Sequence, residues 1–243
     1  MLNSWLTQSV KSFAQTCGFQ ISRFNPAACH FTMLAKALRV RNIDIVLDIG
    51  ANVGQFACGL RRAGFTGRII SFEPLSSAHA QLRRAAKGDK NWLVHDRGAI
   101  SDHRGVVELN ISSNSVSSST LKLLETHIAA APESVVTDVE KCECWSLDET
   151  VARYLDEGDK PFIKIDTQGA EWEVLDGAQR TLSRSSGLLV ELSFVPLYEG
   201  QRLWRDLIDR LAATGFHPWR FDPAFTNAQT GRTLQADCTF FRE

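Results

Sequence analysis

The stretch IDIVLDIGANVGQF, residues 43–56, decides the fold of this chain, because an almost wholly apolar strand runs directly into a glycine-containing turn. A short strand without polar alternation is typical of a parallel sheet that is covered on both faces. Gly50 and Gly54 allow the backbone to turn sharply and to approach a ligand with no Cβ in the way. A helix is expected to follow, from about Gly54 to Ala63.

Strands and helices alternate over the rest of the chain, without a linker or an internal repeat. Further strands are expected at GRIISFEP (67–74), WLVHDRGAI (92–100), VVELNI (106–111), VVTDVEKCECWSL (135–147), FIKID (162–166), GLLVELSF (187–194) and 233–242. Further helices are expected at 30–40, 78–86, 147–155 and 203–214. This pattern predicts an α/β fold with a doubly wound, mostly parallel sheet and an antiparallel C-terminal strand.

Composition narrows the class of protein. The 243 residues are 44% hydrophobic and 23% charged, as in an ordinary globular domain, and a net charge of −1 gives no sign of nucleic-acid binding. No apolar run is long enough to cross a membrane, and the N-terminus lacks the pattern of a signal peptide. The six cysteines include no C-x-x-C pair, so we expect reduced thiols and a cytoplasmic location.

The first residues form a separate unit in this interpretation. Leu2, Leu6, Val10, Phe13 and Cys17 recur at helical spacing. We therefore expect residues 1–42 to be a helical extension that packs on the core, and residues 43–243 to be the catalytic domain. Peripheral membrane contact through this helix stays open, although clustered Lys and Arg are absent. The oligomeric state is not predicted.

Ligands of doubly wound sheets bind beyond the carboxyl ends of the strands, so the residues that follow each strand are the candidates. After the first strand, Asn52 stands where a dinucleotide fingerprint has its middle glycine, and Asp48 precedes the loop. An acid there is poorly suited to a phosphate and well suited to a cation. After the second strand, Glu73 is placed to accept hydrogen bonds from a ribose, and Pro74 turns the chain.

These features describe a nucleoside with a positively charged tail and no phosphate, as in S-adenosylmethionine. Its adenine would lie near the segment DRGAIS, where the candidate contacts are Asp96, Ala99 and Ile100. The alternative enzyme class is a nicotinamide-dependent oxidoreductase. The glycine missing at position 52 and the carboxylate of Asp48 count against it. A domain that binds this ligand without catalysing a reaction is the non-enzyme alternative.

The segments VLDIGANVGQF, SFEP, GAISD, KIDTQGAEWEVLDGA and ELSF, together with a final D-x-x-F, resemble the FkbM family of S-adenosylmethionine-dependent methyltransferases. The resemblance runs from about residue 43 to the C-terminus. It implies a class I methyltransferase fold and O-methylation of hydroxyls on sugars, glycolipids or other natural products. By position it assigns the following residues to the cofactor: Asp48, Gly50, Asn52, Gly54 and Glu73.

Transfer to an alcohol requires help in removing the hydroxyl proton, from a general base or from a divalent metal ion. Asp166 and Glu191 follow or end neighbouring strands and could share one cation, contact the acceptor, or, for Asp166, cap a helix. Glu171 is a weaker candidate and His95 is the best placed histidine. Lys164 is expected to form a salt bridge beneath the site.

Two segments are expected on the acceptor side. SSNSVSSST, residues 112–120, has the composition of a polar wall or lid, or of a simple linker. Three aromatic residues of the C-terminal part, Tyr198, Trp204 and Trp219, could stack on a sugar or pack on the core.

Overall fold

A seven-stranded sheet forms the centre of the protein in the computed structural model, which describes residues 4–19, 21, 25–114 and 117–242. The strand order is β3-β2-β1-β7-β8-β10-β9, and β10 and β9 are the antiparallel members. The strands are β1 (Ile45–Ile49), β2 (Arg68–Phe72), β3 (Trp92–Val94), β7 (Phe162–Ile165), β8 (Gly187–Ser193), β9 (Phe216–Thr226) and β10 (Thr233–Arg242). The predicted doubly wound, mostly parallel sheet is confirmed.

Helices cover both faces of this sheet, which explains why its central strands carry almost no polar residues. On one face lie α2 (His30–Val40), α3 (Gln55–Arg62) and α4 (Ser76–Ala85), which bury Leu34, Leu38, Phe56, Leu60 and Leu82. On the other lie α6 (Leu147–Thr150), α7 (Glu171–Asp176), α8 (Gln179–Arg184) and α9 (Trp204–Ala213). All residues of β1 are buried, as the apolar run of this strand predicts.

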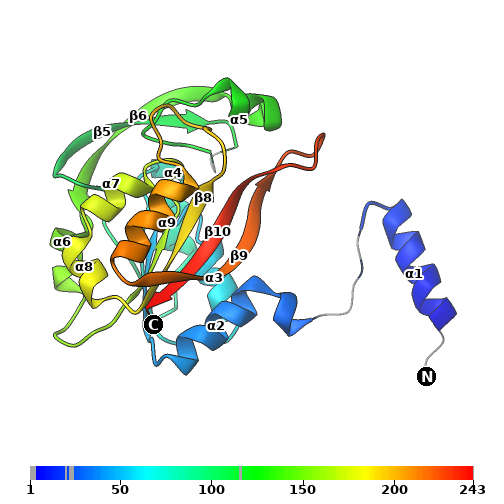
Figure 1. The fold of residues 1–243 in the computed structure, drawn as a ribbon, viewed down its shortest axis with the longest axis horizontal. Coiled ribbons are helices and arrows are strands. Elements are labelled where there is room, and N and C mark those ends of the chain that lie inside the picture. Colours follow the sequence, from blue (N-terminus) through cyan, green and yellow to red (C-terminus); the bar gives the residue numbers. More distant parts are fainter. Residues whose placement is uncertain (1–3, 20, 22–24, 115–116, 243) are drawn as a thin grey trace.

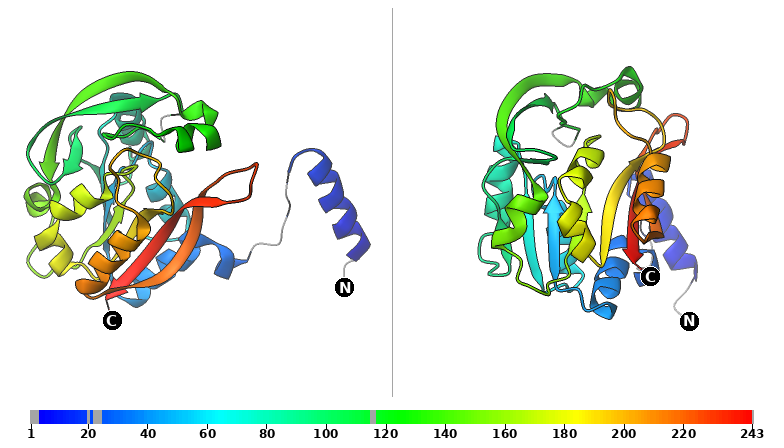
Figure 2. Two further views of the ribbon diagram at one scale, coloured as in Figure 1. Left: turned by 45° about the horizontal axis from the view of Figure 1, so that its top comes forward. Right: turned by 60° about the vertical axis from the view of Figure 1, so that its left-hand side comes forward.

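A second, three-stranded sheet arches over the carboxyl ends of the parallel strands, at the top of Figure 1 and in both views of Figure 2. It is built from β4 (Ala99–Ser101), β5 (Gly105–Ser112) and β6 (Val136–Ser146), and α5 (Glu125–Ala130) lies between β5 and β6. The single strand expected at 92–100 is therefore wrong. Its first residues belong to the large sheet, and Ala99 already pairs with Cys144 in the small one.

The N-terminal region divides into two helices with different surroundings. α2 packs on the core through buried Leu34 and Leu38. α1 (Ser4–Thr16) stands apart from the sheets in Figure 1, and Val10 and Phe13 on it are exposed. Of the residues expected to form its apolar stripe, Leu2 lies outside the described residues. The division of the chain at residue 43 stays a prediction.

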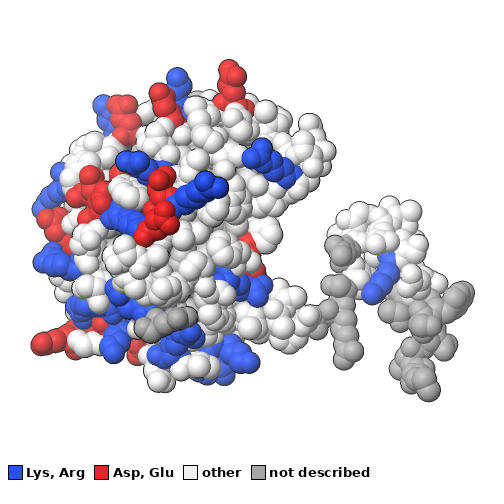
Figure 3. Space-filling view, viewed as in Figure 1, with Lys and Arg blue, Asp and Glu red and all other residues white. Residues whose placement is uncertain are grey.

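Three further features bear on the class of protein. The six cysteines, Cys17, Cys29, Cys58, Cys142, Cys144 and Cys238, are free thiols. Among the described residues, no helix has the length and apolar character needed to cross a membrane. On the face drawn in Figure 3, basic and acidic side chains are interspersed above, and basic ones gather along the lower edge.

Candidate functional site

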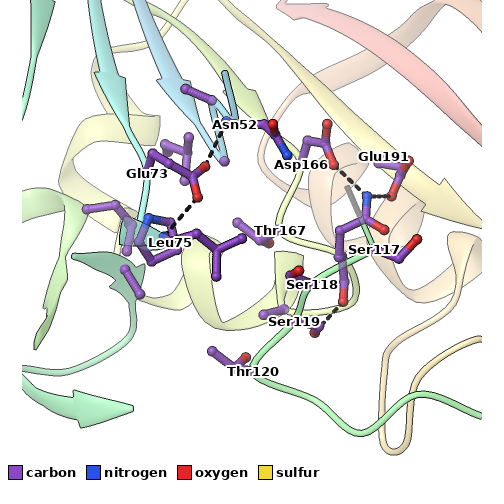
Figure 4. Close-up of a pocket in the computed structure, with 18 of the residues that line it drawn as sticks. Asn52, Glu73, Leu75, Ser117, Ser118, Ser119, Thr120, Asp166, Thr167 and Glu191 are labelled. Atoms are coloured by element: carbon purple, nitrogen blue, oxygen red, sulfur yellow. Dashed lines mark hydrogen bonds between the residues drawn. The ribbon is translucent and has the colours of Figure 1, made fainter. Parts of the chain in front are cut away.

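The strand order reverses between β1 and β7. From β1 the chain continues outward to β2 and β3, and from β7 it continues to β8 on the opposite side of the sheet. A cavity of 540 Å³ opens at the carboxyl ends of these strands. Figure 4 shows Glu73 and Leu75 on one side of it, Asp166 and Glu191 on the other, and residues 117–120 along a third. The site therefore lies where ligands of doubly wound sheets bind.

The loop after β1 follows a path that only particular residues allow. Gly50 has φ +72°, and a Cβ on it would lie 1.8 Å from the carbonyl oxygen of Asp166. The loop thus presses directly against the end of β7. Asn52 also has a positive φ, 47°, a conformation that asparagine tolerates better than most residues. Gly50 and Asn52 line the cavity, whereas Gly54 lies against the ring of Trp92 at the helix start.

Glu73 connects this loop to the end of β2. Its carboxylate accepts hydrogen bonds from the backbone N–H of Asn52 (2.7 Å) and of Leu75 (2.9 Å). Burial outweighs these bonds and raises the pKa of Glu73 to about 7. Each carboxylate oxygen has a second lone pair, so Glu73 can fix the loop and still accept a hydrogen bond from a ligand in the cavity.

Asp48 lies beneath the loop and does not line the cavity. Its carboxylate accepts a hydrogen bond from the Ser71 hydroxyl (3.0 Å) and lies 3.3 Å from the Lys164 ammonium. Lys164 also donates to the Gly50 carbonyl (2.7 Å) and pairs with Asp166 (3.4 Å). The sequence suggested that Asp48 would attract a cation, and in the structure that cation is the Lys164 ammonium. The predicted salt bridge of Lys164 is confirmed.

Asp166 and Glu191 come together on the other side of the cavity. The side-chain amide of Gln168 donates to Asp166 Oδ1 (2.8 Å) and to Glu191 Oε2 (2.9 Å). Burial, and then the charge of Asp166, raise the pKa of Glu191 well above its usual range. Asp237, which pairs with Glu191 across β10 and β8, also lines the cavity, and burial raises its pKa to about 6.

Glu171, and not Asp166, has the structural role at the start of α7. Its carboxylate accepts hydrogen bonds from the backbone N–H of Thr167 (3.1 Å) and Gly169 (3.0 Å). It is 3% exposed and does not line the cavity, and burial raises its pKa to about 7. Glu171 therefore holds the turn between β7 and α7, which carries Asp166 and Gln168.

The other predicted residues divide in the same way. Pro74, Ala99 and Ile100 line the cavity, whereas Asp96 does not, because its exposed carboxylate turns towards Arg153 (3.9 Å).

His95 also lies outside the cavity. Its Nε2 accepts from the Arg153 guanidinium (3.1 Å), and its Nδ1–H donates to the Tyr154 hydroxyl (2.7 Å). Burial, and then the charge of Arg153, lower the pKa of His95 to about 4. Both ring nitrogens are thus engaged away from the cavity, and we do not retain His95 as a base.

The wall opposite the glycine loop contains residues that the sequence did not single out: Gln168, Gln235 and Phe225 of β9 line the cavity. His127, a weaker base candidate than His95 in the sequence, lines it as well. Tyr198 is buried beside them, and its hydroxyl donates to Gln168 Oε1 (2.7 Å). Trp219 lies elsewhere, against Phe241. The polar segment expected to be a lid does contribute to the wall: the lining residues from it are Asn114, Ser117, Ser118, Ser119 and Thr120.

The donor set does not fit a divalent cation. In the described part of the chain, no three His, Cys, Asp or Glu side chains are grouped to hold a metal ion. Where a cation shared by Asp166 and Glu191 would lie, the N–H groups of Gln168 already bridge their oxygens. An ammonium group lies beside them as well. We therefore assign no metal ligand.

The same residues fit S-adenosylmethionine. Gly50, Asn52 and Glu73 give a cavity wall that a ribose can approach, and Pro74, Ala99 and Ile100 provide the apolar surface that an adenine needs. The acids Asp166, Glu191 and Asp237 line the same cavity, where a positively charged tail would enter. No lysine or arginine other than Lys164 lines the described part of the cavity wall, and the Lys164 ammonium is already paired with Asp48 and Asp166.

Comparison with known proteins agrees with this arrangement. The family described as the methyltransferase FkbM domain matches residues 48–218. The 2-O-methyltransferase NoeI of Sinorhizobium fredii (strain NBRC 101917 / NGR234) is 27% identical over 180 residues, which are 69% of this chain and 70% of that protein.

Two solved structures are similar to this chain at low sequence identity. A putative O-methyltransferase from Klebsiella pneumoniae has a TM-score of 0.50 and 10% identity, covering 100% of this chain and 92% of that one. Magnesium protoporphyrin IX methyltransferase (ChlM) from Synechocystis PCC 6803, solved with bound SAM, has a TM-score of 0.47 and 11% identity, covering 97% and 96%. Sheet order, site and family match together show that this chain belongs to the FkbM family of S-adenosylmethionine-dependent methyltransferases.

Proposed function

We propose that this methyltransferase acts on a hydroxyl group of a sugar, a glycolipid or another hydroxyl-bearing natural product. The observation that carries the proposal is the contrast between the cavity walls. Opposite the glycine loop stands a wall of hydroxyls and amides, which includes Ser117–Thr120, Gln168 and Gln235, with two carboxyl groups beside it. Such a wall can hydrogen-bond a polyhydroxylated acceptor. The similarity to a 2-O-methyltransferase supports the same reaction.

On the cofactor side we propose that Gly50, Asn52, Glu73, Pro74, Ala99 and Ile100 contact S-adenosylmethionine. Asp48 and Gly54 act indirectly, by fixing the loop from below and at the helix start. The bound cofactor supplies an electrophilic methyl group. The protein orients the acceptor and receives its proton.

Asp166 is the proposed base. It lines the cavity, and its side chain is 33% exposed, whereas the neighbouring Glu191 is buried, so an incoming hydroxyl can reach Asp166 more easily. In the reaction the acceptor oxygen forms a bond to the methyl carbon, the carbon–sulfur bond breaks with its electron pair going to sulfur, and the hydroxyl proton passes to Asp166. Placing the two reacting groups side by side supplies a large part of the rate.

Calorimetry with purified protein tests the cofactor assignment. We expect binding of S-adenosylmethionine and of its demethylated product, and none of NAD(H). The NAD-dependent alternative predicts the reverse. No binding at millimolar ligand would contradict the assignment.

A screen of sugar, glycolipid and polyphenol acceptors with methyl-labelled cofactor tests the acceptor class. Label in a hydroxyl-bearing sugar is the expected result. Cofactor binding without transfer to any acceptor would favour the alternative of a non-catalytic binding domain. The cytoplasmic location stays a prediction, and so does the possible contact of α1 with a membrane surface. Fractionation of cells that express the tagged chain checks both.

A further inference from the structure

Gln168 is the residue at which the acceptor wall, the acids and the β7 turn meet. It lies in the segment KIDTQGA with a positive φ of 55°. Its backbone carbonyl accepts a hydrogen bond from the Ser119 hydroxyl (2.6 Å), and its Oε1 accepts one from the Tyr198 hydroxyl (2.7 Å). Its Nε2 donates to Asp166 and to Glu191. Every hydrogen of this amide is therefore directed to a carboxyl group.

The orientation of the Gln168 amide follows from its neighbours. Burial raises the pKa of Tyr198, so its hydroxyl keeps its proton and donates to Oε1. With the opposite orientation, Oε1 would face Asp166 and the Glu191 Oε2 that already accepts from Gln235, and two acceptors would meet without a hydrogen between them. The Tyr198 hydroxyl could also donate to the Ser117 carbonyl (3.3 Å), so its bond to Oε1 agrees with this orientation and does not impose it. The carboxyl groups thus fix which end of Gln168 meets them.

Glu191 has two unlike oxygens as a result. Oε2 accepts from Gln168 (2.9 Å) and from Gln235 (2.7 Å), whereas Oε1 has no hydrogen bond within the described part of the chain. The charged groups that face Glu191 come from three elements and one turn: Lys164 on β7, Asp166 in the turn after β7, Glu171 on α7 and Asp237 on β10. Burial and the three acids outweigh the lysine and favour the protonated form. The proton then sits on Oε1.

Asp166 differs from Glu191 in each of these respects. Its Oδ2 forms an ion pair with Lys164 (3.4 Å), and its side chain is 33% exposed, whereas the Glu191 residue is 8% exposed. The carboxyl groups of Asp166 and Glu191 accept hydrogen bonds from the same amide group. Without that amide between them, they would share one proton. The Gln168 amide is the group that separates them.

We propose that Gln168 is a positioning residue, which keeps Asp166 as a proton acceptor and Glu191 as a hydrogen-bond donor towards one hydroxyl bound in the cavity. The inference rests on the proposed function. The Glu191 Oε1–H donates a hydrogen bond to an oxygen of the acceptor and keeps its proton throughout. Asp166 receives the proton that the acceptor loses. No other group of the protein gains or loses a proton, and the electron pair of the broken carbon–sulfur bond goes to sulfur as described above.

The first test compares Gln168→Met with Gln179→Met. Methionine has nearly the same length as glutamine and no amide, and Gln179 makes one backbone hydrogen bond (2.7 Å, to Leu175) outside the cavity. In Gln168→Met we expect kcat to fall roughly tenfold or more, while the affinity for S-adenosylmethionine changes by less than about twofold. Gln179→Met should match the wild type in both.

The pH profile separates positioning from a general loss of structure. Without the amide, the two carboxyl groups share a proton, and Asp166 is free as a base only after that proton leaves. The acidic limb of kcat/KM should therefore move to higher pH by about one unit in Gln168→Met, and by less in Tyr198→Phe. A lower rate at every pH with an unmoved limb would overturn the inference.

A second measurement does not depend on finding the acceptor. At pH 7, the infrared difference spectrum of the wild type minus Glu191→Gln should show the C=O stretch of a protonated carboxyl group, which belongs to Glu191. That band should shift or weaken in Gln168→Met and stay unchanged in Gln179→Met. A wild type without the Glu191 band overturns the inference, even if methyl transfer is found. A wild type with the band but without transfer to any acceptor contradicts the proposed function only.

Discussion

The two sides of the cavity hold their acids by different means. On the cofactor side, Glu73 is bound by backbone N–H groups, and Asp48 by a buried lysine. On the acceptor side, Asp166 and Glu191 are bound by the side-chain amides of Gln168 and Gln235. A backbone donor is kept in every substitution except one to proline, whereas an amide donor is lost when its residue changes. The contacts of Glu73 are thus fixed by the fold, and those of Asp166 and Glu191 depend on side chains that substitution can change.

The largest expected effect concerns the lysine that joins the two sides. Although burial lowers it, the carboxylates of Asp166 and Asp48 together raise the pKa of Lys164. Lys164→Met leaves Asp48 buried without a counter-charge and should lower the free energy of unfolding by about 3–5 kcal/mol.

Urea denaturation measures this loss, with Lys141→Met as the matched control. The ammonium of Lys141 pairs with Glu108 at the surface (3.2 Å), so its removal should cost less than about 1 kcal/mol. Equal losses in the two variants would show that the buried pair contributes no more than a surface one.

The next effect tests the cofactor side alone. Glu73→Ala removes the acceptor of two backbone N–H groups and of a ribose hydroxyl, so the affinity for S-adenosylmethionine should fall by about 1–3 kcal/mol. Calorimetry measures it, and Glu149→Ala, an exposed acid, is the control. Unchanged affinity would remove Glu73 from the site.

The pH dependence of binding sharpens the same point. Since the pKa of Glu73 is raised to about 7, the carboxyl group is protonated below that pH and accepts fewer hydrogen bonds. Adenosine has a ribose but no charged tail. Its affinity should therefore rise as the pH increases through about 7, and Glu73→Gln should abolish the rise. A flat titration of the wild type would contradict this role.

The smallest effect is expected at Asp96, which the sequence suggested and the structure places at the surface. Asp96→Ala should change the affinity for S-adenosylmethionine by less than about 0.5 kcal/mol, because its carboxylate faces solvent and Arg153. Calorimetry against the wild type decides the matter. A loss as large as that of Glu73→Ala would put Asp96 back in the site.

Much of the fold was predictable, because buried parallel strands need apolar residues on both faces. The runs at β1, β7 and β8 meet that need, and the strand expected at 233–242 is β10. β9 was missed because Pro218 and Pro223 indicate a loop. Its position explains both prolines: β9 is the edge of the sheet and pairs with β10 alone, so it can spare backbone N–H groups.

The candidate site was predictable on the cofactor side and less so on the acceptor side. Gly50 and Glu73 follow strands directly, so position in the chain places them. Gln168 is uncharged and gives no sequence signal, since its role depends on Tyr198 and Glu191, which lie far along the chain. The sequence favoured His95 over the other histidines, whereas the folded chain places His127 and not His95 at the cavity.

The small sheet has a consequence for evolution and engineering. Much of the hydroxyl-rich wall of the cavity comes from residues 105–135, a segment that leaves β4 and returns to it by way of β6. The described residues of this segment contribute no strand to the large sheet. Chimaeras in which residues 105–135 are exchanged between relatives should therefore take on the acceptor preference of the donor protein and keep their affinity for the cofactor.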